Sequence, residues 1–350
     1  MLSQLKTIAK PLIKRAIISS GLEAAALMSS MGVGKAARGR GAIFTLHHVR
    51  PRASNAFQPN DILDITPEFL ETAILALKRE GYQFIRIEDI ASRLSSPETT
   101  PFACFTLDDG YRDNAEFAAS IFTKYGVPFT IFLTKGFVDA THSMWWETID
   151  MVLNQIDRLQ FDFGNGPETV AAATNPQKLI AFNRIADFIN NADETQAVGR
   201  LDDAASKAGI DPLGITRTLT MRGDALRTLA ENPLVTYGAH TVSHRGLARL
   251  SAQEAEREIA ESVNRVTEIV GVEPKSFAYP YGDQRSVSQR ERGMLRSLGI
   301  DIAVTTRPGT LGPQHASDLT ATPRISLNGH YQKARYVGAL ASGLPFKLMG

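Results

Sequence analysis

The sequence has a single cysteine, almost no net charge and no long apolar run. One cysteine among 350 residues excludes an intramolecular disulfide and a metal cluster built from several thiolates. Because Cys104 lies within an apolar stretch, we interpret it as a small buried side chain. A net charge of +1 gives no global indication of a nucleic-acid partner or of an anionic membrane. No apolar run approaches the roughly 18 residues that suggest a transmembrane helix.

The first 40 residues also lack the continuous apolar segment of about 7–15 residues that a secretory signal requires. Pro11 and Glu23 interrupt the scattered apolar positions, and several lysines accompany them. We therefore expect residues 1–40 to form a helical extension and linker, and the protein to be cytoplasmic or peripheral at the inner membrane. The extension is either an ordinary packing helix or one whose basic face contacts a membrane surface.

From residue 41 onward, apolar strand-like runs alternate with amphipathic helical patterns. Thr66 and Pro67 begin one such helix, and Ser251 with Glu254 forms a capping box at the start of another. This alternation predicts a parallel α/β sheet, open or closed into a barrel. The predicted strands are 42–49, 84–87, 102–107, 129–133, 234–239, 276–282, 302–305 and 323–327.

The alternation is interrupted between about residues 137 and 232. This segment is mostly helical in pattern, polar, and broken by turn-forming joints such as 163–166. We interpret it as a helical insertion that packs on the sheet or covers it as a lid. It contains both tryptophans of the chain, Trp145 and Trp146. They either pack the insertion onto the sheet or offer a stacking surface to a ligand.

Two adjacent carboxylates, Asp108 and Asp109, end the apolar strand 102–107. Like charges at the end of a buried strand repel each other and lose hydration, which a folding argument alone does not explain. A cation would explain them, since one carboxylate could bind the ion and the other could act as a base. Gly110 would allow the sharp turn that follows.

Two histidines spaced four apart, His240 and His244, follow another predicted strand. The carboxyl ends of parallel strands converge on one face, so both can meet Asp109 there. One oxygen and two nitrogen ligands are typical of an open catalytic site, in which the metal acidifies water. Asp108 would then be the general base, and the Tyr281 backbone N–H could stabilise an oxyanion.

Three motifs in this order resemble those of the polysaccharide deacetylases, the NodB-homology group of carbohydrate esterase family 4. They are Thr106–Gly110, His240–His244 and Tyr279–Gly282. The resemblance covers residues 41–350 apart from the insertion and implies a distorted (β/α)7-type barrel. It implies that Asp108 is the base, that Asp109, His240 and His244 bind the metal, and that Tyr281 supplies the oxyanion N–H.

The chain departs from this family pattern at two places. Ala278 stands where many members carry an arginine that orients the base; Arg324 could approach instead, or be a solvated or capping residue. The late histidine that serves as general acid is not clear, and His330 is out of register. Some members use a histidine after the first strand. We therefore predict His48 as the acid and treat His47, His142 and His315 as structural or exposed.

The resemblance implies a hydrolase of carbon–nitrogen bonds other than peptide bonds, which removes N-acetyl groups from an oligo- or polysaccharide of the chitooligosaccharide type. Zinc is the expected metal, with cobalt, nickel or manganese as alternatives. Tyr111, Pro280 and Arg324 are expected to contact the substrate, and the tryptophans could stack on a sugar face. The competing hypotheses are a metal-dependent hydrolase of a small non-sugar amide and a glycan-binding protein without turnover.

Overall fold

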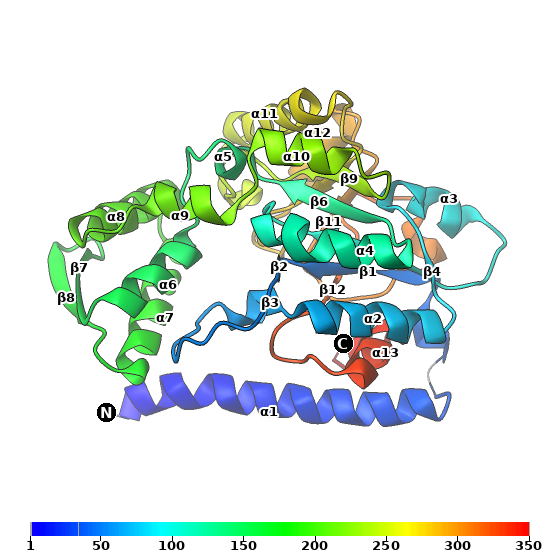
Figure 1. Ribbon diagram of the computed structural model, residues 1–350, viewed down its shortest axis with the longest axis horizontal. Helices are drawn as coiled ribbons and strands as arrows, with labels where there is room; N and C mark the ends of the chain where they lie inside the picture. The colour runs from blue at the N-terminus through cyan, green and yellow to red at the C-terminus, as the bar shows by residue number, and fades with distance from the viewer. Residues whose placement is uncertain (1, 34, 350) are drawn as a thin grey trace.

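A curled sheet of parallel strands occupies the centre of the molecule (Figure 1). The computed structural model describes the backbone of residues 2–33 and 35–349, and the side chains of residues 13–33 and 37–347. Seven strands follow the order β11-β10-β9-β6-β5-β1-β12, and β4 pairs with the start of β5. They are β1 (Gly41–Leu46), β4 (Gln83–Phe84), β5 (Phe102–Leu107), β6 (Phe129–Leu133), β9 (Val235–Ala239), β10 (Ser276–Ala278), β11 (Ile302–Val304) and β12 (Ile325–Ser326).

The predicted parallel, barrel-like α/β fold is confirmed, as a curled half-barrel. The two ends of the sheet approach each other through the segment before β12. Val304 of β11 forms a parallel bridge with Thr322, and Ile325 of β12 pairs with Phe44 of β1. The sheet therefore curls far enough for side chains at the carboxyl ends of distant strands to meet.

Helices cover the outside of the sheet at the positions that capping residues indicate. The Thr66 hydroxyl accepts from the Phe69 N–H, and Ser251 and Glu254 form the predicted capping box. Gly271 ends the longest of these helices in the left-handed conformation, with φ of 80°. The helices are α2 (Pro67–Arg79), α3 (Ile90–Ser95), α4 (Ala119–Tyr125), α10 (Gly223–Ala230), α11 (Ala252–Val270), α12 (Gln289–Ser297), α13 (Ala334–Ala341) and α14 (Leu344–Met349).

The predicted first strand is in fact two strands. β1 ends at Leu46, and after His47 a separate strand β2 (His48–Val49) pairs in parallel with β3 (Asp64–Ile65). The break lies where the Asn114 side-chain amide donates to the His47 carbonyl, at 2.8 Å. A side chain from another segment therefore turns the chain here, which strand periodicity does not predict.

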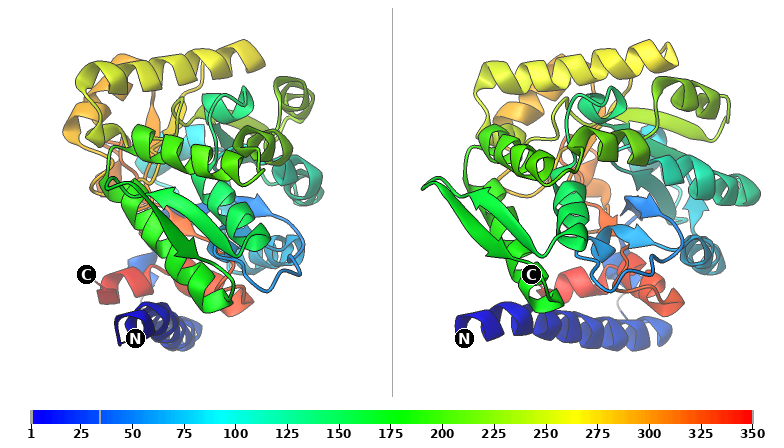
Figure 2. Two further views of the ribbon diagram at one scale, coloured as in Figure 1. Left: turned by 90° about the vertical axis from the view of Figure 1, so that its left-hand side faces the viewer. Right: turned by 60° about the vertical axis from the view of Figure 1, so that its left-hand side comes forward.

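The interrupting segment folds to one side of the sheet and contains a β-hairpin as well as helices (Figures 1 and 2). The joint at 163–166 is the turn of this hairpin, and the apolar residues of the segment form their own core. Helix α10 instead packs on α11 and the sheet, so the insertion ends earlier than predicted, near residue 219. Its elements are α5 (Lys135–Val138), α6 (Trp145–Gln155), β7 (Arg158–Asp162), β8 (Pro167–Ala171), α7 (Asn175–Asn191), α8 (Glu194–Lys207) and α9 (Pro212–Leu219).

The N-terminal extension is one long helix, α1 (Leu2–Ser30), along the edge of the molecule (Figure 1). It contacts α13 and α14 of the sheet layer and α7 of the insertion. Among the described residues, no helix has the length and apolar character needed to cross a membrane.

Candidate metal and catalytic site

Asp109, His240 and His244 come together at the carboxyl ends of β5 and β9. Nε2 of His240 lies 3.6 Å from Asp109 Oδ1, and Nε2 of His244 lies 3.5 Å from the same oxygen. One ligand atom from each residue falls within 4.8 Å of the other two. These three residues, separated by about 130 positions in the sequence, thus form one donor cluster of two nitrogens and one oxygen.

The two histidines of the cluster are neutral, and His240 presents an unprotonated nitrogen. His240 Nδ1 lies 2.6 Å from the Ala278 carbonyl of β10, which can only accept, so this nitrogen carries the hydrogen and Nε2 is free. Burial lowers the pKa of both imidazoles, further for His244 with His240 beside it. Both side chains are therefore in the form that binds a metal ion.

Asp109 lacks a partner of opposite charge. Its Oδ1 is buried and accepts no hydrogen bond from the described residues. Burial and the neighbouring Asp108 charge raise the pKa of the Asp109 carboxyl well above its ordinary value. A buried carboxylate oxygen facing two neutral imidazoles is a favourable site for a divalent cation, so the residues present fit such an ion.

Asp108, by contrast, is fully paired. Arg324 donates to Oδ1 at 2.8 Å and to Oδ2 at 2.7 Å, and only 1% of the arginine is exposed. Burial opposes the charge on Asp108, but this guanidinium holds the pKa of the carboxyl well below its ordinary range. The two adjacent aspartates therefore differ, one ionised and oriented by arginine, the other left for a cation.

Arg324 orients the carboxylate of Asp108, in place of the arginine that many family members have at the position of Ala278. It stands just before β12 and is also fixed by the Thr305 carbonyl, which accepts from Nε at 2.9 Å. The hypothesis that Arg324 approaches the base from the last strand agrees with this geometry. Its predicted contact with substrate stays a prediction, and in this structure the guanidinium is enclosed and bonded to Asp108.

His47, which the sequence suggested to be structural or exposed, lies inside the site. Leu46 and Leu107 are register partners, so the next residues, His47 and Asp108, lie side by side. His47 Nε2 is 3.9 Å from Asp108 Oδ2, and a quarter of the side chain is exposed. Burial lowers the pKa of His47 to about 4, which leaves it neutral.

His48 points to the opposite side and is completely buried. Its Nδ1 bonds Asp113, its Nε2 lies 3.6 Å from Glu147 Oε1, and its ring lies against Tyr111 at a centroid distance of 3.5 Å. Burial opposes its charge, but Asp113 and Glu147 outweigh burial and raise the pKa of His48 to about 9. His48 faces Asp113 and Glu147, so its role as proton donor stays a prediction, to which His47 is the alternative.

The charged state of His48 predicts a pH-dependent contribution to stability. Its folded pKa of about 9 lies above the ordinary 6.5, so the contribution is complete below pH 6.5 and is lost as the pH rises through 9. We expect His48→Gln to lower the free energy of unfolding by up to about 3 kcal/mol more at pH 6 than at pH 9.5. Urea unfolding at both pH values measures this, with His315→Gln as control; an equal loss at both would contradict it.

Two buried residues that were expected to contact substrate do not offer a surface. Tyr111 is fully enclosed, and its hydroxyl accepts from Trp146 Nε1 at 2.9 Å. Pro280 is also buried. Tyr281 is partly exposed, and in the described part of the chain no group accepts from its backbone N–H. This free N–H agrees with the predicted oxyanion role for Tyr281, while the predicted substrate contacts of the buried Tyr111 and Pro280 stay predictions.

The insertion covers the cluster with Trp145, Trp146 and Glu194. The Trp146 ring lies 4.9 Å from the His244 ring. Trp145 Nε1 donates to the Tyr281 hydroxyl at 3.0 Å, and this hydroxyl donates to Glu194 Oε1 at 2.5 Å. The tryptophans thus adjoin the metal ligands, and the insertion forms one wall of the site.

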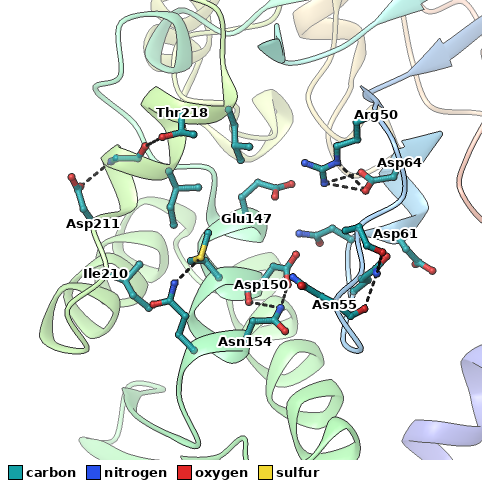
Figure 3. Close-up of a pocket in the computed structure, with 18 of the residues that line it drawn as sticks. Arg50, Asn55, Asp61, Asp64, Glu147, Asp150, Asn154, Ile210, Asp211 and Thr218 are labelled. Carbon is teal, nitrogen blue, oxygen red and sulfur yellow. Dashed lines mark hydrogen bonds and ion pairs between the residues drawn. The ribbon is translucent and has the colours of Figure 1, made fainter. Parts of the chain in front are cut away.

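Two cavities lie on either side of α6. One, of about 750 Å³, is lined by His244, both tryptophans and polar residues of α8. The other, of about 620 Å³, is shown in Figure 3, where Glu147 and Asp150 face Arg50 and Asp64 across the opening. The first cavity is the one that contains a cluster residue, and it is large enough for a sugar unit.

The backbone around the cluster is strained. Five non-glycine residues of the described part have positive φ, and four of them surround the cluster: Asp109, Thr241, His244 and Tyr281, with φ between 59° and 71°. Glu258 of α11 fixes one of these turns, because its carboxylate accepts from the Val242 and Ser243 N–H groups at 2.8 Å. The sequence shows Glu258 only as an acidic residue within an apolar helix stripe.

Comparison with known proteins agrees with this geometry. Residues 200–303 match the family model described as polysaccharide deacetylase, which includes the second and third motifs but not the aspartate pair. No curated protein sequence matches the chain. The predicted resemblance to polysaccharide deacetylases is confirmed by the family match over residues 200–303.

Solved deacetylases share the fold at low sequence identity. Streptococcus pyogenes deacetylase PplD, in complex with acetate, is 16% identical with a TM-score of 0.54, covering 82% of this chain and 92% of that one. IcaB from Ammonifex degensii is 14% identical with a TM-score of 0.53, covering 87% and 97%. The BpsB deacetylase domain from Bordetella bronchiseptica is 15% identical with a TM-score of 0.51, covering 82% and 95%. These similarities establish the fold.

Proposed function

We propose that this hydrolase of the polysaccharide deacetylase type is metal-dependent and removes N-acetyl groups from amino sugars of an oligo- or polysaccharide. The observation that carries the proposal is the unequal treatment of the two aspartates. A buried oxygen of Asp109 without a hydrogen-bond partner faces two neutral imidazoles. The adjacent Asp108 is held in its ionised form by Arg324. One carboxylate is thus prepared to bind and the other to take a proton.

Asp109, His240 and His244 would hold the divalent ion. Zinc suits a set of two imidazoles and one carboxylate, and cobalt, nickel or manganese are alternatives. When bound, such an ion polarises the acetyl carbonyl and acidifies water. Asp109 and His240 are buried, and His244 is the most exposed of the three ligands. His244 lines the cavity beside Trp145 and Trp146, so we expect the substrate to approach from that side.

The other residues of the site handle the proton and the developing charge. Asp108 takes a proton from a water molecule while the water oxygen attacks the acetyl carbon. Arg324 keeps the Asp108 carboxylate ionised and oriented. The free N–H of Tyr281 donates to the oxyanion that forms. The bond from the acetyl carbon to nitrogen then breaks, and the products are acetate and a free amine.

We assign the proton transfer to the leaving nitrogen to His47. Its Nε2 lies 3.9 Å from Asp108, so it can receive the proton that Asp108 has taken, and a quarter of its side chain is exposed. Its low pKa makes the imidazolium a ready donor. Its neighbour His48, enclosed by Asp113, Glu147 and Tyr111, would then hold the segment that positions His47.

A sugar substrate is favoured over a small amide by the cavity that contains His244. It measures about 750 Å³ and is lined by two tryptophans and several polar side chains. The tryptophans suit the apolar face of a pyranose ring, and the polar side chains suit its hydroxyl groups. A glycan-binding protein without turnover is the less favoured alternative, because binding alone does not require the Asp108–Arg324 pair. Acetate bound to S. pyogenes PplD is the product that we expect here.

The test is release of acetate from N-acetylglucosamine oligomers by the purified protein. We expect activity with added zinc, cobalt or nickel, none after chelation, and less than about one thousandth after His240→Ala with His244→Ala, since both nitrogen ligands are lost. Metal content by mass spectrometry should fall from one ion per chain to none. Metal retained by this double variant would contradict the site assignment.

A panel of substrates separates the competing functions. Acetate release from acetylated glycans, with no ammonia release from small ureides or imides, supports the proposal. The reverse result would identify a hydrolase of small amides. Tight glycan binding by the metal-loaded protein without release of either product would identify a binding protein.

A further inference from the structure

Helix α1 exposes an apolar strip on the side that faces away from the protein. Ile13, Ile17, Leu27 and Met31 are 59%, 66%, 63% and 64% exposed. At 100° per residue, these positions lie within a strip about 80° wide. Half of the large apolar side chains exposed in the described part of the chain lie between residues 13 and 33. Such a concentration on one helix marks a contact surface rather than scattered exposure.

The opposite side of α1 already satisfies the packing needs of the helix. Leu22 and Ala25 are buried, the latter in a cluster with Ala339 and Leu344 of α13 and α14. Glu23 accepts hydrogen bonds from Arg335 of α13. In Figure 1, α1 runs along the lower edge with the rest of the protein above it. The exposed strip is therefore separate from the face that holds the helix in place.

The N-terminal segment that contains the strip has a net positive charge. Seven of the 38 basic residues and one of the 37 acidic residues lie in residues 1–40, so the rest of the chain is net acidic. The one acidic residue, Glu23, faces α13 and is paired there. Lys14, adjacent to Ile13, is exposed. Arg15 pairs with Asp61 at 2.9 Å, and both side chains stay 40% exposed. An apolar strip beside an exposed lysine, on a segment of net positive charge, is complementary to anionic lipid headgroups above an acyl layer.

We propose that α1 is a membrane-surface helix, which lies in the headgroup region of a bilayer containing anionic lipids and inserts Ile13, Ile17, Leu27 and Met31. The helix is too polar to cross the bilayer, which leaves the surface orientation. A second copy of the chain suits the strip less well. Pairing two such helices would bring two basic segments together, and Ser20 and Ala24 leave the middle of the strip without large side chains.

Flotation of the full chain with vesicles tests this proposal. We expect binding to vesicles of phosphatidylglycerol and phosphatidylcholine, weaker binding to phosphatidylcholine alone, and weaker binding in high salt. Ile13→Gln with Ile17→Gln should lower the partition coefficient at least about tenfold, because two inserted side chains are lost. The matched control, Val272→Gln with Leu298→Gln, replaces exposed apolar residues of the α11–α12 region and should leave binding within about twofold.

Circular dichroism and thermal unfolding establish that each variant is folded. Equal vesicle binding by the wild type and the Ile13/Ile17 variant would overturn the proposal, as would no binding by the wild type. A wild-type dimer by light scattering that the same variant converts to monomers would overturn it too, since a second copy would then cover the strip. Acetate release is not measured in any arm, so the outcome is independent of the proposed function.

Discussion

Replacement of Asp108 by asparagine should lower the rate of acetate release by about a hundredfold to ten-thousandfold while one metal ion per chain remains bound. Asparagine keeps the shape of the side chain but cannot take a proton, and general-base catalysis is worth roughly 10²- to 10⁴-fold. The metal should remain because Asp109, His240 and His244 are the ligands, and Asp108 faces Arg324 instead.

The loss should appear in kcat, since Asp108 acts on the attacking water and not in holding the glycan. Asp301→Asn makes the same chemical change at an exposed position and serves as the matched control. Acetate release by Asp108→Asn within tenfold of the wild type would assign the base to another residue. Loss of the metal together with activity would place Asp108 among the ligands.

Replacement of Arg324 by glutamine should destabilise the protein by about 3–5 kcal/mol, because it leaves a buried carboxylate without its cation. The pair is almost fully enclosed, with 1% of Arg324 and 2% of Asp108 exposed, so solvent cannot compensate. Activity should fall as well, since the pKa of Asp108 would rise toward a range in which it no longer accepts a proton. Denaturant unfolding at pH 7 measures the first effect and acetate release the second.

The matched control is the double variant Arg324→Gln with Asp108→Asn. Removing both charges leaves no isolated ion in the interior, so the double variant should be more stable than Arg324→Gln alone by at least about 1 kcal/mol. A double variant no more stable than the single one would mean that the bonds of Arg324 to Thr305 and Thr106, rather than to Asp108, account for its contribution.

Much of the site could be predicted because its chemistry is local in the sequence. Adjacent aspartates at the end of an apolar strand are costly without a ligand, and parallel topology carries the end of β5 and the end of β9 to the same edge. Asp109, His240 and His244 are accordingly brought together as predicted. Capping residues such as Thr66 and Ser251 fix helix starts for equally local reasons.

The assignment of the two neighbouring histidines could not be made from alternation alone. Neighbouring side chains of an extended strand point to opposite faces, so only one of His47 and His48 can face the cluster. Which of the two faces the cluster depends on the register of β1 against β5, where Leu46 pairs with Leu107. The register between strands about 60 residues apart cannot be predicted from the sequence of either strand alone. Asp113 and Asn114, which hold this segment, also come from another element.

The contacts between the insertion and the site also could not be predicted from the sequence. Glu194 and Trp145 reach Tyr281 from helices that pack on a separate apolar core. The hairpin β7–β8 was missed because its strands are short and polar on one face, and its glycine-rich turn resembles a helix joint. Tertiary packing, not local pattern, decides both features.

The left-handed backbone at Asp109, Thr241, His244 and Tyr281 has a consequence for how this chain could change over evolution. Glycine would relieve the backbone strain at each position, because it adopts a positive φ without steric cost. At Thr241 and Tyr281 it would also remove side-chain hydrogen bonds to His244, Trp145 and Glu194. Selection for backbone stability alone would therefore act against the ligand side chains of Asp109 and His244, so a lineage with glycine at these two positions would keep the barrel and lose the metal site.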